Sequence, residues 1–316
     1  MHRHGILFRP FLALLATVVW AASAAAQSEW ITPNFGTWDD PANWIGGVPN
    51  APGDVAIFGT QTGPFVDVVI NAAPVTVEEI AFVDSGFVSI SGLQSLNLAS
   101  FDGATIPRFF VDVSSESPFI DVELTGAEGL EKLGPSDLFL NGPANYSGPT
   151  VVGQGVLVLG SSTQIQNGPI AVLQGAGLDV GSHPSYSLAP AQVLGGGGTV
   201  FAQQLRVPTA AALDPGDGVG TLTIAGSLLL DAFGPAGAGL NFELTGDPIG
   251  ANDPIDVTND LSVVGNHVVQ VVPVDNQLAP GDYPLFTYGG SLNLGLGSLQ
   301  VVNSTRLGIA LDTAVP

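Results

Sequence analysis

The sequence has no cysteine, very few basic residues and no apolar run long enough to cross a membrane. The lack of cysteine excludes disulfide scaffolds, thiolate zinc sites, iron–sulfur clusters and cysteine nucleophiles. Only 6 of the 316 residues are Lys or Arg, against 28 Asp and Glu, so the formal net charge is −22. A chain with this charge is repelled by phosphate backbones, which excludes nucleic-acid binding through a basic patch.

What the sequence does contain is apolar side chains, glycine and proline. Hydrophobic residues make up 45% of the chain and charged residues 11%, so a large apolar core can form and disorder is excluded for most of its length. The 42 glycines and 24 prolines stay below the share, roughly 25–30%, that is typical of low-complexity chains. Without disulfides, the fold must depend on a continuous apolar core or on metal ions. The many carboxylates allow Ca²⁺ counter-ions, but the favoured interpretation is that they keep a β surface soluble.

The first 26 residues have the layout of a secretory signal peptide. A basic start is followed by an apolar stretch, Pro10–Ala22, and then by the small residues Ala24 and Ala26, which predict cleavage before Gln27. The alternative is a transmembrane anchor, which needs about 20 apolar residues, more than this stretch provides. The protein is therefore expected to be exported, with an extracellular or cell-surface location, outer-membrane association being an alternative. The mature chain has no predicted transmembrane segment.

Alternating apolar and polar residues predict an all-β fold. Runs of four to eight residues alternate in this way between Gly, Pro, Asn and Asp, and no window has a sustained helical period. The clearest examples are Val66–Ile70, Val88–Ile90, Leu96–Leu98, Val111–Val113, Val122–Leu124, Leu157–Leu159, Leu222–Ile224 and Phe242–Leu244.

The spacing of these units favours a β-solenoid. Similar units recur about every 20 residues, which is typical of one coil of three short strands and three turns. They begin at Leu138, Leu157, Leu178, Thr199 and Thr221. A single coil cannot bury its inward side chains, so coils must stack and align like residues into apolar ladders. The alternative is an antiparallel sandwich with a regular hairpin spacing of roughly 8–12 residues.

Three regions follow the predicted signal peptide. Residues 27–84 are Pro-rich and are expected to form an N-terminal β cap, because an open solenoid end is an exposed sheet edge that must be blunted. Residues 85–230 are expected to form regular coils. Residues 231–316 contain longer strands and form either the last coils or a small C-terminal β layer. The cap is anchored by Trp30, Trp38 and Trp44.

Residues 126–160 resemble the autotransporter-associated β-strand repeat. The matching positions are Gly129, Leu130, Lys132, Gly134, Leu138, Leu140, Gly142, Asn145, Tyr146, Gly148, Thr150, Val151, Gly155, Leu157, Leu159 and Gly160. Pro149 departs from the pattern, which usually has a small or polar residue there. Flanking blocks are similar to companion units of such repeats in large secreted proteins of planctomycetes; they are Gly36–Trp44 with Gly46–Pro49 and Pro52–Asp54, Leu194–Val200, and Leu213–Gly216 with Gly220–Ile224.

This resemblance implies a right-handed parallel β-helix that is exported and displayed or released at a bacterial cell surface. It implies no enzymatic activity.

Two carboxylate pairs are candidates for acid/base catalysis. Asp39 and Asp40 are adjacent, so on a strand they face opposite sides, and the Trp-Asp-Asp-Pro context favours a turn. Asp121 and Glu123 are two residues apart and on one strand would share a face, about 7 Å apart, as in an inverting glycosidase. The favoured interpretation is that both are solvated surface acids.

A further group of acids was considered for Ca²⁺ turns, namely Asp253, Asp256 and Asp260, and Asp214 with Asp217. Their spacings match neither the EF-hand loop nor the nonapeptide calcium repeat. The sequence therefore assigns no metal ligand, and calcium remains an alternative only.

Other chemistry-bearing residues show no convergent pattern. His183 precedes a proline and is expected to face solvent, and His267 is far from it in the sequence. Gly195–Gly198 lacks the residues of a phosphate loop and is interpreted as a coil corner. Arg108 and Arg206 are the only bases expected near regular coils. The four tyrosines, Tyr146, Tyr186, Tyr283 and Tyr288, share no 20-residue register.

The sequence thus predicts no catalytic, cofactor-binding or metal-ligating residue. The favoured hypothesis is a secreted or cell-surface structural or adhesive β-helix without catalysis, with surface glycans or other cell-surface proteins as partners and no nucleic acid. The alternative is a β-helix that binds or degrades polysaccharides, which exposed aromatic residues along one face would favour.

Overall fold

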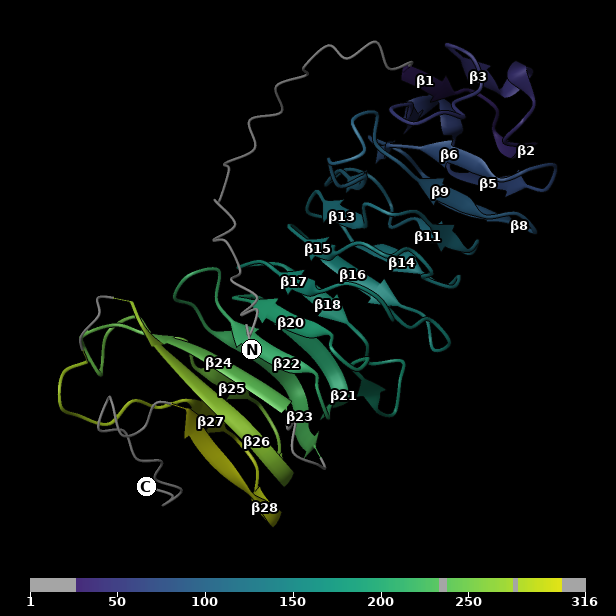
Figure 1. Cartoon of the computed structure of the whole chain (residues 1–316). Coiled ribbons are helices and arrows are strands. Elements are labelled where there is room, and N and C mark those ends of the chain that lie inside the picture. Colours follow the sequence, from purple (N-terminus) through teal and green to yellow (C-terminus); the bar gives the residue numbers. More distant parts are fainter. Residues whose placement is uncertain (1–26, 233–237, 275–277, 303–316) are drawn as a thin grey trace, which may run out of the picture.

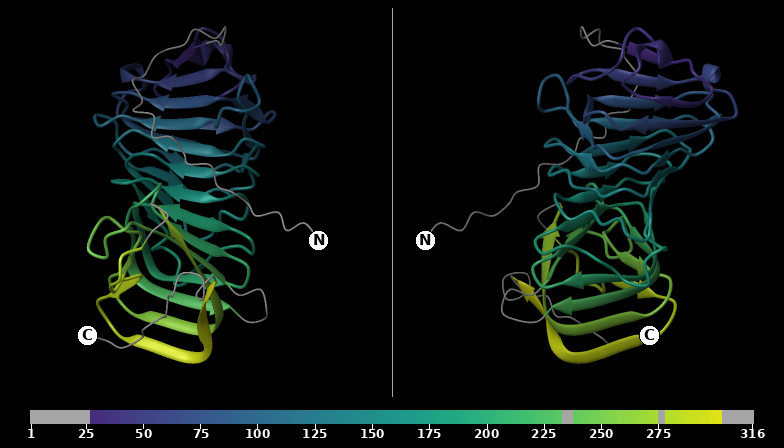
Figure 2. Two further views of the ribbon diagram at one scale, coloured as in Figure 1. Left: turned by 60° about the vertical axis from the view of Figure 1, so that its left-hand side comes forward. Right: turned by 90° about the vertical axis from the view of Figure 1, so that its right-hand side faces the viewer.

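The computed structural model describes residues 27–232, 238–274 and 278–302. The predicted signal peptide, residues 1–26, lies outside them, as does Arg306. The described chain is built from short strands that stack in three parallel ladders along one axis (Figures 1 and 2). Every strand pair in these residues is parallel except β1 with β3. The predicted parallel β-helix is therefore confirmed, and the antiparallel sandwich is wrong.

The first ladder runs the length of the molecule. Its strands are β1 (Gln27–Trp30), β4 (Val55–Phe58), β7 (Glu79–Phe82), β10 (Arg108–Val111), β13 (Leu130–Leu133), β15 (Thr150–Val152), β17 (Ile170–Val172), β20 (Val193–Gly196), β22 (Ala212–Pro215), β24 (Ala238–Leu244) and the C-terminal halves of β26 (Leu261–Pro273) and β28 (Leu292–Val302).

The second ladder lies beside it. Its strands are β2 (Asn34–Thr37), β5 (Phe65–Ile70), β8 (Phe87–Gly92), β11 (Phe119–Ile120), β14 (Leu138–Leu140), β16 (Val156–Leu159), β18 (Gly177–Asp179), the first parts of β21 (Thr199–Pro208) and β23 (Leu222–Ala232), β25 (Ile255–Val257) and β27 (Phe286–Tyr288).

The third ladder is less regular. It contains β6 (Val75–Val77), β9 (Leu96–Leu98) and β12 (Leu124–Thr125), continues through single bridges at Ala144 and Ile165, and takes up β19 (Tyr186–Ser187). Beyond β19 it consists of the later parts of β21 and β23 and the first parts of β26 and β28. These long strands bend from one ladder into another at the C-terminal end (Figure 2).

Alternation along each strand decides which side chains enter the core. In β23 the burial alternates without a break, so Leu222, Ile224, Leu228 and Leu230 point inward. Stacking aligns such residues from rung to rung; the second ladder pairs Leu138 with Leu157 and Leu157 with Leu178. Each fully buried aliphatic side chain of this kind contributes about 1.5–3 kcal/mol.

The predicted register is right for the first three units and wrong for the last two. Leu178 pairs with Val200 rather than Thr199, and Thr199 pairs with Thr223 rather than Thr221. The inward residues at these rungs are Val200 and Ile224, so the apolar side chains set the register.

The N-terminal end is closed by an aromatic cluster and a short antiparallel strand. After η1 (Pro41–Asn43), β3 (Trp44–Ile45) pairs with β1. Trp30, Trp38 and Trp44 surround Phe58, with ring centroids 5.9, 6.2 and 5.8 Å from its ring. The parallel ladders already run through residues 27–84, so this region supplies rungs as well as the closed end.

The division into domains at residues 84 and 230 remains a prediction. The ladders run across both positions. After residue 230 the described strands continue the parallel stacking. None of the helices in the described residues has the length and apolar character needed to cross a membrane.

Candidate functional site

The adjacent acids near the N-terminus shape a turn, as predicted. The Asp40 carboxylate accepts a hydrogen bond of 2.9 Å from the backbone N–H of Ala42 and caps the short helix η1. Asp39 is exposed beside it.

The geometry expected for Asp121 and Glu123 is wrong. They lie in the bend between β11 and β12 and not on one strand, because the chain turns a coil corner there. Asp121 Oδ1 accepts a hydrogen bond of 2.7 Å from Asn141 Nδ2, and Glu123 accepts one from Asn145. Each acid is held by an amide of the next rung, as expected for surface acids that tie neighbouring coils together.

The acids considered for calcium turns separate into different surroundings. Asp256 Oδ1 accepts from Thr287 Oγ1 at 2.6 Å, and Asp260 Oδ1 accepts from the Ser291 N–H at 2.7 Å. Asp217 is exposed in the loop after β22. Only Asp214 and Asp253 are brought together, beside Glu243.

Among these acids, Asp253 has the pKa that is shifted furthest from its ordinary value. It is 1% exposed, and its carboxylate accepts hydrogen bonds from the backbone N–H groups of Gly220 at 2.6 Å and Glu243 at 2.8 Å. Desolvation outweighs these bonds and, with the nearby charges of Glu243 and Asp214, raises the pKa of Asp253 to about 7. Burial also raises the pKa of Asp214. The carboxyl of Asp253 thus links the loop before β23 to strand β24.

Acidification is expected to stabilise the fold through Asp253. Its pKa in the folded chain, about 7, is above the ordinary value of 3.8, so unfolding releases a proton between these pH values. The free energy of unfolding therefore falls as the pH rises through this window. Guanidinium unfolding midpoints across the window measure this slope.

Asp253→Asn is neutral at every pH and should reduce that slope, to which Asp214 also contributes, whereas the exposed Asp282→Asn should keep it. Equal slopes for the wild type and Asp253→Asn contradict the assignment.

Calcium binding remains only the alternative to the expectation that no metal is bound. Within residues 27–232, 238–274 and 278–302, no three His, Cys, Asp or Glu side chains are placed so that they could hold one metal ion.

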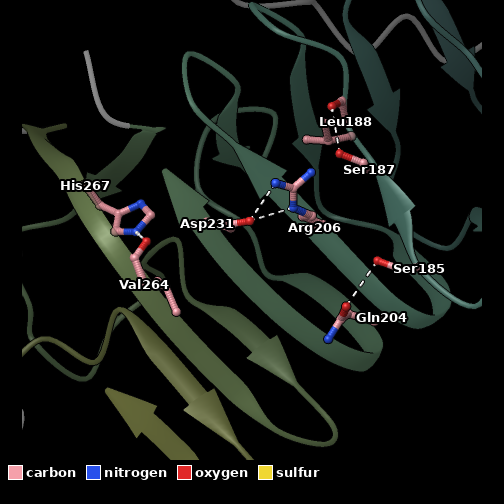
Figure 3. Close-up of polar contacts among 8 residues, drawn as sticks. All are labelled: Ser185, Ser187, Leu188, Gln204, Arg206, Asp231, Val264 and His267. Carbon is pink, nitrogen blue, oxygen red and sulfur yellow. Dashed lines mark hydrogen bonds and ion pairs between the residues drawn. The ribbon is translucent and has the colours of Figure 1, made fainter. Parts of the chain in front are cut away.

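The expectation that His183 faces solvent is wrong. It is 5% exposed, its Nδ1 lies 3.3 Å from the carbonyl oxygen of Val180, and its ring meets Tyr186 edge-on with centroids 5.3 Å apart. The residues around the turn fold back onto the ring and bury it. His267 is also buried, with Nε2 3.0 Å from the Val264 carbonyl oxygen, and burial lowers its pKa (Figure 3). The two rings make separate contacts with their own neighbouring carbonyls.

The Lys and Arg side chains of the described residues all make contacts within the molecule. Arg108 Nε donates to Glu79 at 2.9 Å on the first ladder, and Arg206 Nη2 lies 2.6 Å from Asp231 Oδ2 (Figure 3). Contrary to expectation, Lys132 also belongs to a regular coil, on β13. Its buried ammonium donates to the carbonyls of Leu133, Gly134 and Gln154 at 3.0, 2.8 and 3.1 Å, and desolvation lowers its pKa to about 8.

The glycine run and two tyrosines are structural. Gly195–Gly198 spans the end of β20 and the turn to β21, in agreement with a coil corner. Tyr146 and Tyr186 are buried; the hydroxyl of Tyr146 lies 2.7 Å from Thr150 Oγ1, and that of Tyr186 accepts from the Ile165 N–H. Burial raises the pKa of both phenols. Neither ring is available to a ligand at the surface.

The strongest surface feature was missed by the sequence analysis. Four outward rings, Phe65, Phe87, Phe119 and Phe139, stack on the outer face of the second ladder, and we call them the phenylalanine stripe. Their successive ring centroids are 5.5, 5.1 and 4.5 Å apart, with interplanar angles of 4, 44 and 4°. The stripe crosses strands β5, β8, β11 and β14, which lie one above another in Figure 1.

The stripe is partly open to solvent. Phe65 is 47% exposed and the other three rings are half-buried. Each stacked aromatic pair contributes about 0.5–1.5 kcal/mol beyond its buried area, so the stack also supports the packing of the coils. A continuous row of partly exposed rings differs from isolated surface apolar residues and makes the stripe a candidate interaction site.

Polar side chains flank the stripe on the same face. Asp67 accepts a hydrogen bond of 2.9 Å from Ser91, and Asp121 accepts from Ser89 at 3.2 Å as well as from Asn141. These bonds run between rungs and hold the carboxylates in place at the edge of the rings.

A local signal for the stripe existed in the sequence. Each ring precedes an inward aliphatic residue, in the pairs Phe65-Val66, Phe87-Val88, Phe119-Ile120 and Phe139-Leu140. Alternation therefore indicated outward phenylalanines on strands. The sequence did not show that they stack, because the loops between these rungs differ in length.

Comparison with known proteins gives one partial similarity. The chain is 32% identical over 165 residues to the "Adhesin BmaC autotransporter" of Brucella suis biovar 1 (strain 1330). The match covers 50% of this chain and 4% of the relative, so the chain spans a small part of that protein's length. It fits an autotransporter-type, β-rich protein. No protein-family model matches the chain, and no solved structure matches it.

Proposed function

We propose that this protein is an exported, surface-displayed adhesive β-helix without catalytic activity. The observation that carries the proposal is the phenylalanine stripe, a partly exposed row of rings on a parallel solenoid. Such a row is also the feature expected of a polysaccharide-binding β-helix, so carbohydrate binding through these rings is the alternative function. The similarity to a protein named as an adhesin and autotransporter supports it. The proposal that the protein is exported rests on the predicted signal peptide. We also propose that the protein belongs to the planctomycete-type group of such repeat proteins.

The placement of the acids supports a binding role over catalysis. A glycosidase needs two carboxyls that face one substrate, and Asp121 and Glu123 each hold an amide of the following rung instead. Asp253 is engaged by two backbone N–H groups inside the fold.

Attachment of coated beads tests the adhesive function. Beads carrying the chain from Gln27 onward are expected to attach to animal or bacterial cell layers more strongly than uncoated beads. Phe119→Ser/Phe139→Ser should reduce attachment by roughly tenfold, because the contacts of two partly exposed rings amount to about 1.4 kcal/mol. Phe101→Ser, which removes a 72% exposed ring outside the stripe, is the matched control.

Two outcomes contradict the proposal. One is attachment no better than that of uncoated beads on every cell layer. The other is release of reducing sugar from polysaccharides by the wild type that Asp121→Ala abolishes, because this result favours the alternative of a carbohydrate-degrading β-helix.

A further inference from the structure

The outer face of the second ladder carries a row of rings and carboxylates in continuous register. Phe35 pairs with Asp67, Asp67 with Ser89, Ser89 with Phe119, and Phe119 with Phe139. The same row continues through Val158, Asp179 and Phe201. Phe35 and Phe201, at its two ends, are 60% and 40% exposed.

The carboxylates of this face have no basic partner on the same strands. The bases of the described residues are Arg108, Lys132 and Arg206, of which the two arginines pair with Glu79 and Asp231 and the lysine is buried. None of the three lies on strands β2, β5, β8, β11, β14, β16 or β18. Arg206 shares strand β21 with Phe201, but it lies in the later part of that strand, which belongs to the third ladder, and it pairs with Asp231. The face is therefore both apolar and negatively charged.

The negative charge of this face favours some binding partners over others. A second copy of the chain would bring another formal charge of −22 to an acidic face, and like charges in contact disfavour association. Anionic glycans and anionic lipid headgroups are disfavoured for the same reason. A positively charged partner is attracted over a distance of about a Debye length.

The geometry of the rings further narrows the chemistry of the partner. In the pairs Phe65–Phe87 and Phe119–Phe139 the planes are within 4° of parallel and the centroids are 5.5 and 4.5 Å apart, so a neighbouring ring lies against part of each ring face. A neutral sugar stacks on an open ring face, whereas Leu and the aliphatic stems of Lys and Arg can pack against any exposed part of the rings. Long basic side chains can lie along such a surface and place their charged heads near carboxylates such as Asp67 and Asp121.

We infer that the outer face of the second ladder, from Phe35 to Phe201, is a docking surface for a positively charged polypeptide segment that combines Lys or Arg with aliphatic residues. This inference rests on the proposed adhesive function and names its partner class. The rings supply apolar contact, and the carboxylates at their edge supply charge selection.

A labelled synthetic peptide tests the inference on the chain from Gln27 onward. The probe has four repeats of Leu-Arg-Gly, and its dissociation constant is measured by fluorescence anisotropy at low and at physiological salt. Two further peptides replace Leu with Gly or Arg with Glu. We expect the Leu-Arg-Gly peptide to bind most tightly, the Leu-free peptide to bind more weakly at both salt concentrations, and the Glu peptide not to bind.

Variants assign the binding to this face. Phe119→Ser/Phe139→Ser should weaken binding about tenfold, equivalent to about 1.4 kcal/mol, and Phe101→Ser should leave it unchanged. Asp67→Asn/Asp121→Asn should weaken it mainly at low salt, and the exposed Asp282→Asn should not. Circular dichroism and thermal melting confirm that each variant is folded; the Asp variants leave the rings in place and provide a second test if the Phe variant does not fold.

Several results overturn the inference. They are equal affinity for the Leu-free peptide, unchanged binding to folded variants of the stripe, preferential binding of a neutral oligosaccharide, or self-association through the same rings in sedimentation experiments. If beads attach to cells while the peptide binds no better than its controls, the adhesive function stands and this partner class is wrong.

Discussion

Replacing Gly134 with alanine is expected to destabilise the β-helix by about 3–5 kcal/mol, whereas the matched change at Gly175 should cost about 1 kcal/mol. The two glycines have nearly the same backbone conformation, with φ of +80° and +82°. A Cβ at Gly134 would lie 2.1 Å from the carbonyl oxygen of Val111, while a Cβ at Gly175 meets nothing within 4 Å. The difference between the variants therefore isolates the close approach of two coils from the strain of the positive φ.

Gly134 also contributes to the surroundings of the buried lysine two residues before it. Gly134 follows β13, and its carbonyl oxygen accepts a hydrogen bond of 2.8 Å from the buried Lys132 ammonium. A side chain there would push the coil away from Val111 and disturb that bond. Guanidinium unfolding of both variants measures the effect, and equal losses for Gly134→Ala and Gly175→Ala contradict the steric argument.

Phe58→Ala is expected to cost about 3–5 kcal/mol and to change the tryptophan emission of the protein. The Phe58 ring is fully buried among Trp30, Trp38 and Trp44 and also stacks on Phe82, with centroids 5.4 Å apart. Removing it leaves a cavity in the aromatic cluster that closes the N-terminal end of the solenoid.

Fluorescence reports on this end directly. In the chain from Gln27 onward, the tryptophans are Trp30, Trp38 and Trp44, and all three belong to the cluster. We expect the emission of Phe58→Ala to shift to longer wavelength and to change at lower denaturant than in the wild type. Phe101→Ala, at an exposed ring, should change neither property. Unaltered emission and stability of Phe58→Ala show that the cluster does not close the end.

Several features followed from local sequence alone. Alternation predicted strands that bury Leu138, Leu157 and Leu178, because inside and outside are decided within a single strand. The spacing of those units predicted stacked coils, and the structure pairs all three. Asp40 was placed correctly in a turn, since a side chain that caps its own turn needs no distant partner.

Features that join one coil to another could not be predicted from the local sequence. The stripe unites rings at positions 65, 87, 119 and 139, and the loops between them are unequal, so no constant period marks them. Asp253 meets the N–H groups of Gly220 and Glu243 only because an intervening strand and loop bring them back to it.

The sequence by itself determined the strand type, the inward residues and the stacking of coils in this protein. The tertiary structure alone decided the exact rung register beyond Leu178, the partners of the buried acids and the alignment of the outward rings. The physical reason is that strand alternation depends on neighbours two residues away. A contact between coils depends on the summed length and path of every turn between them.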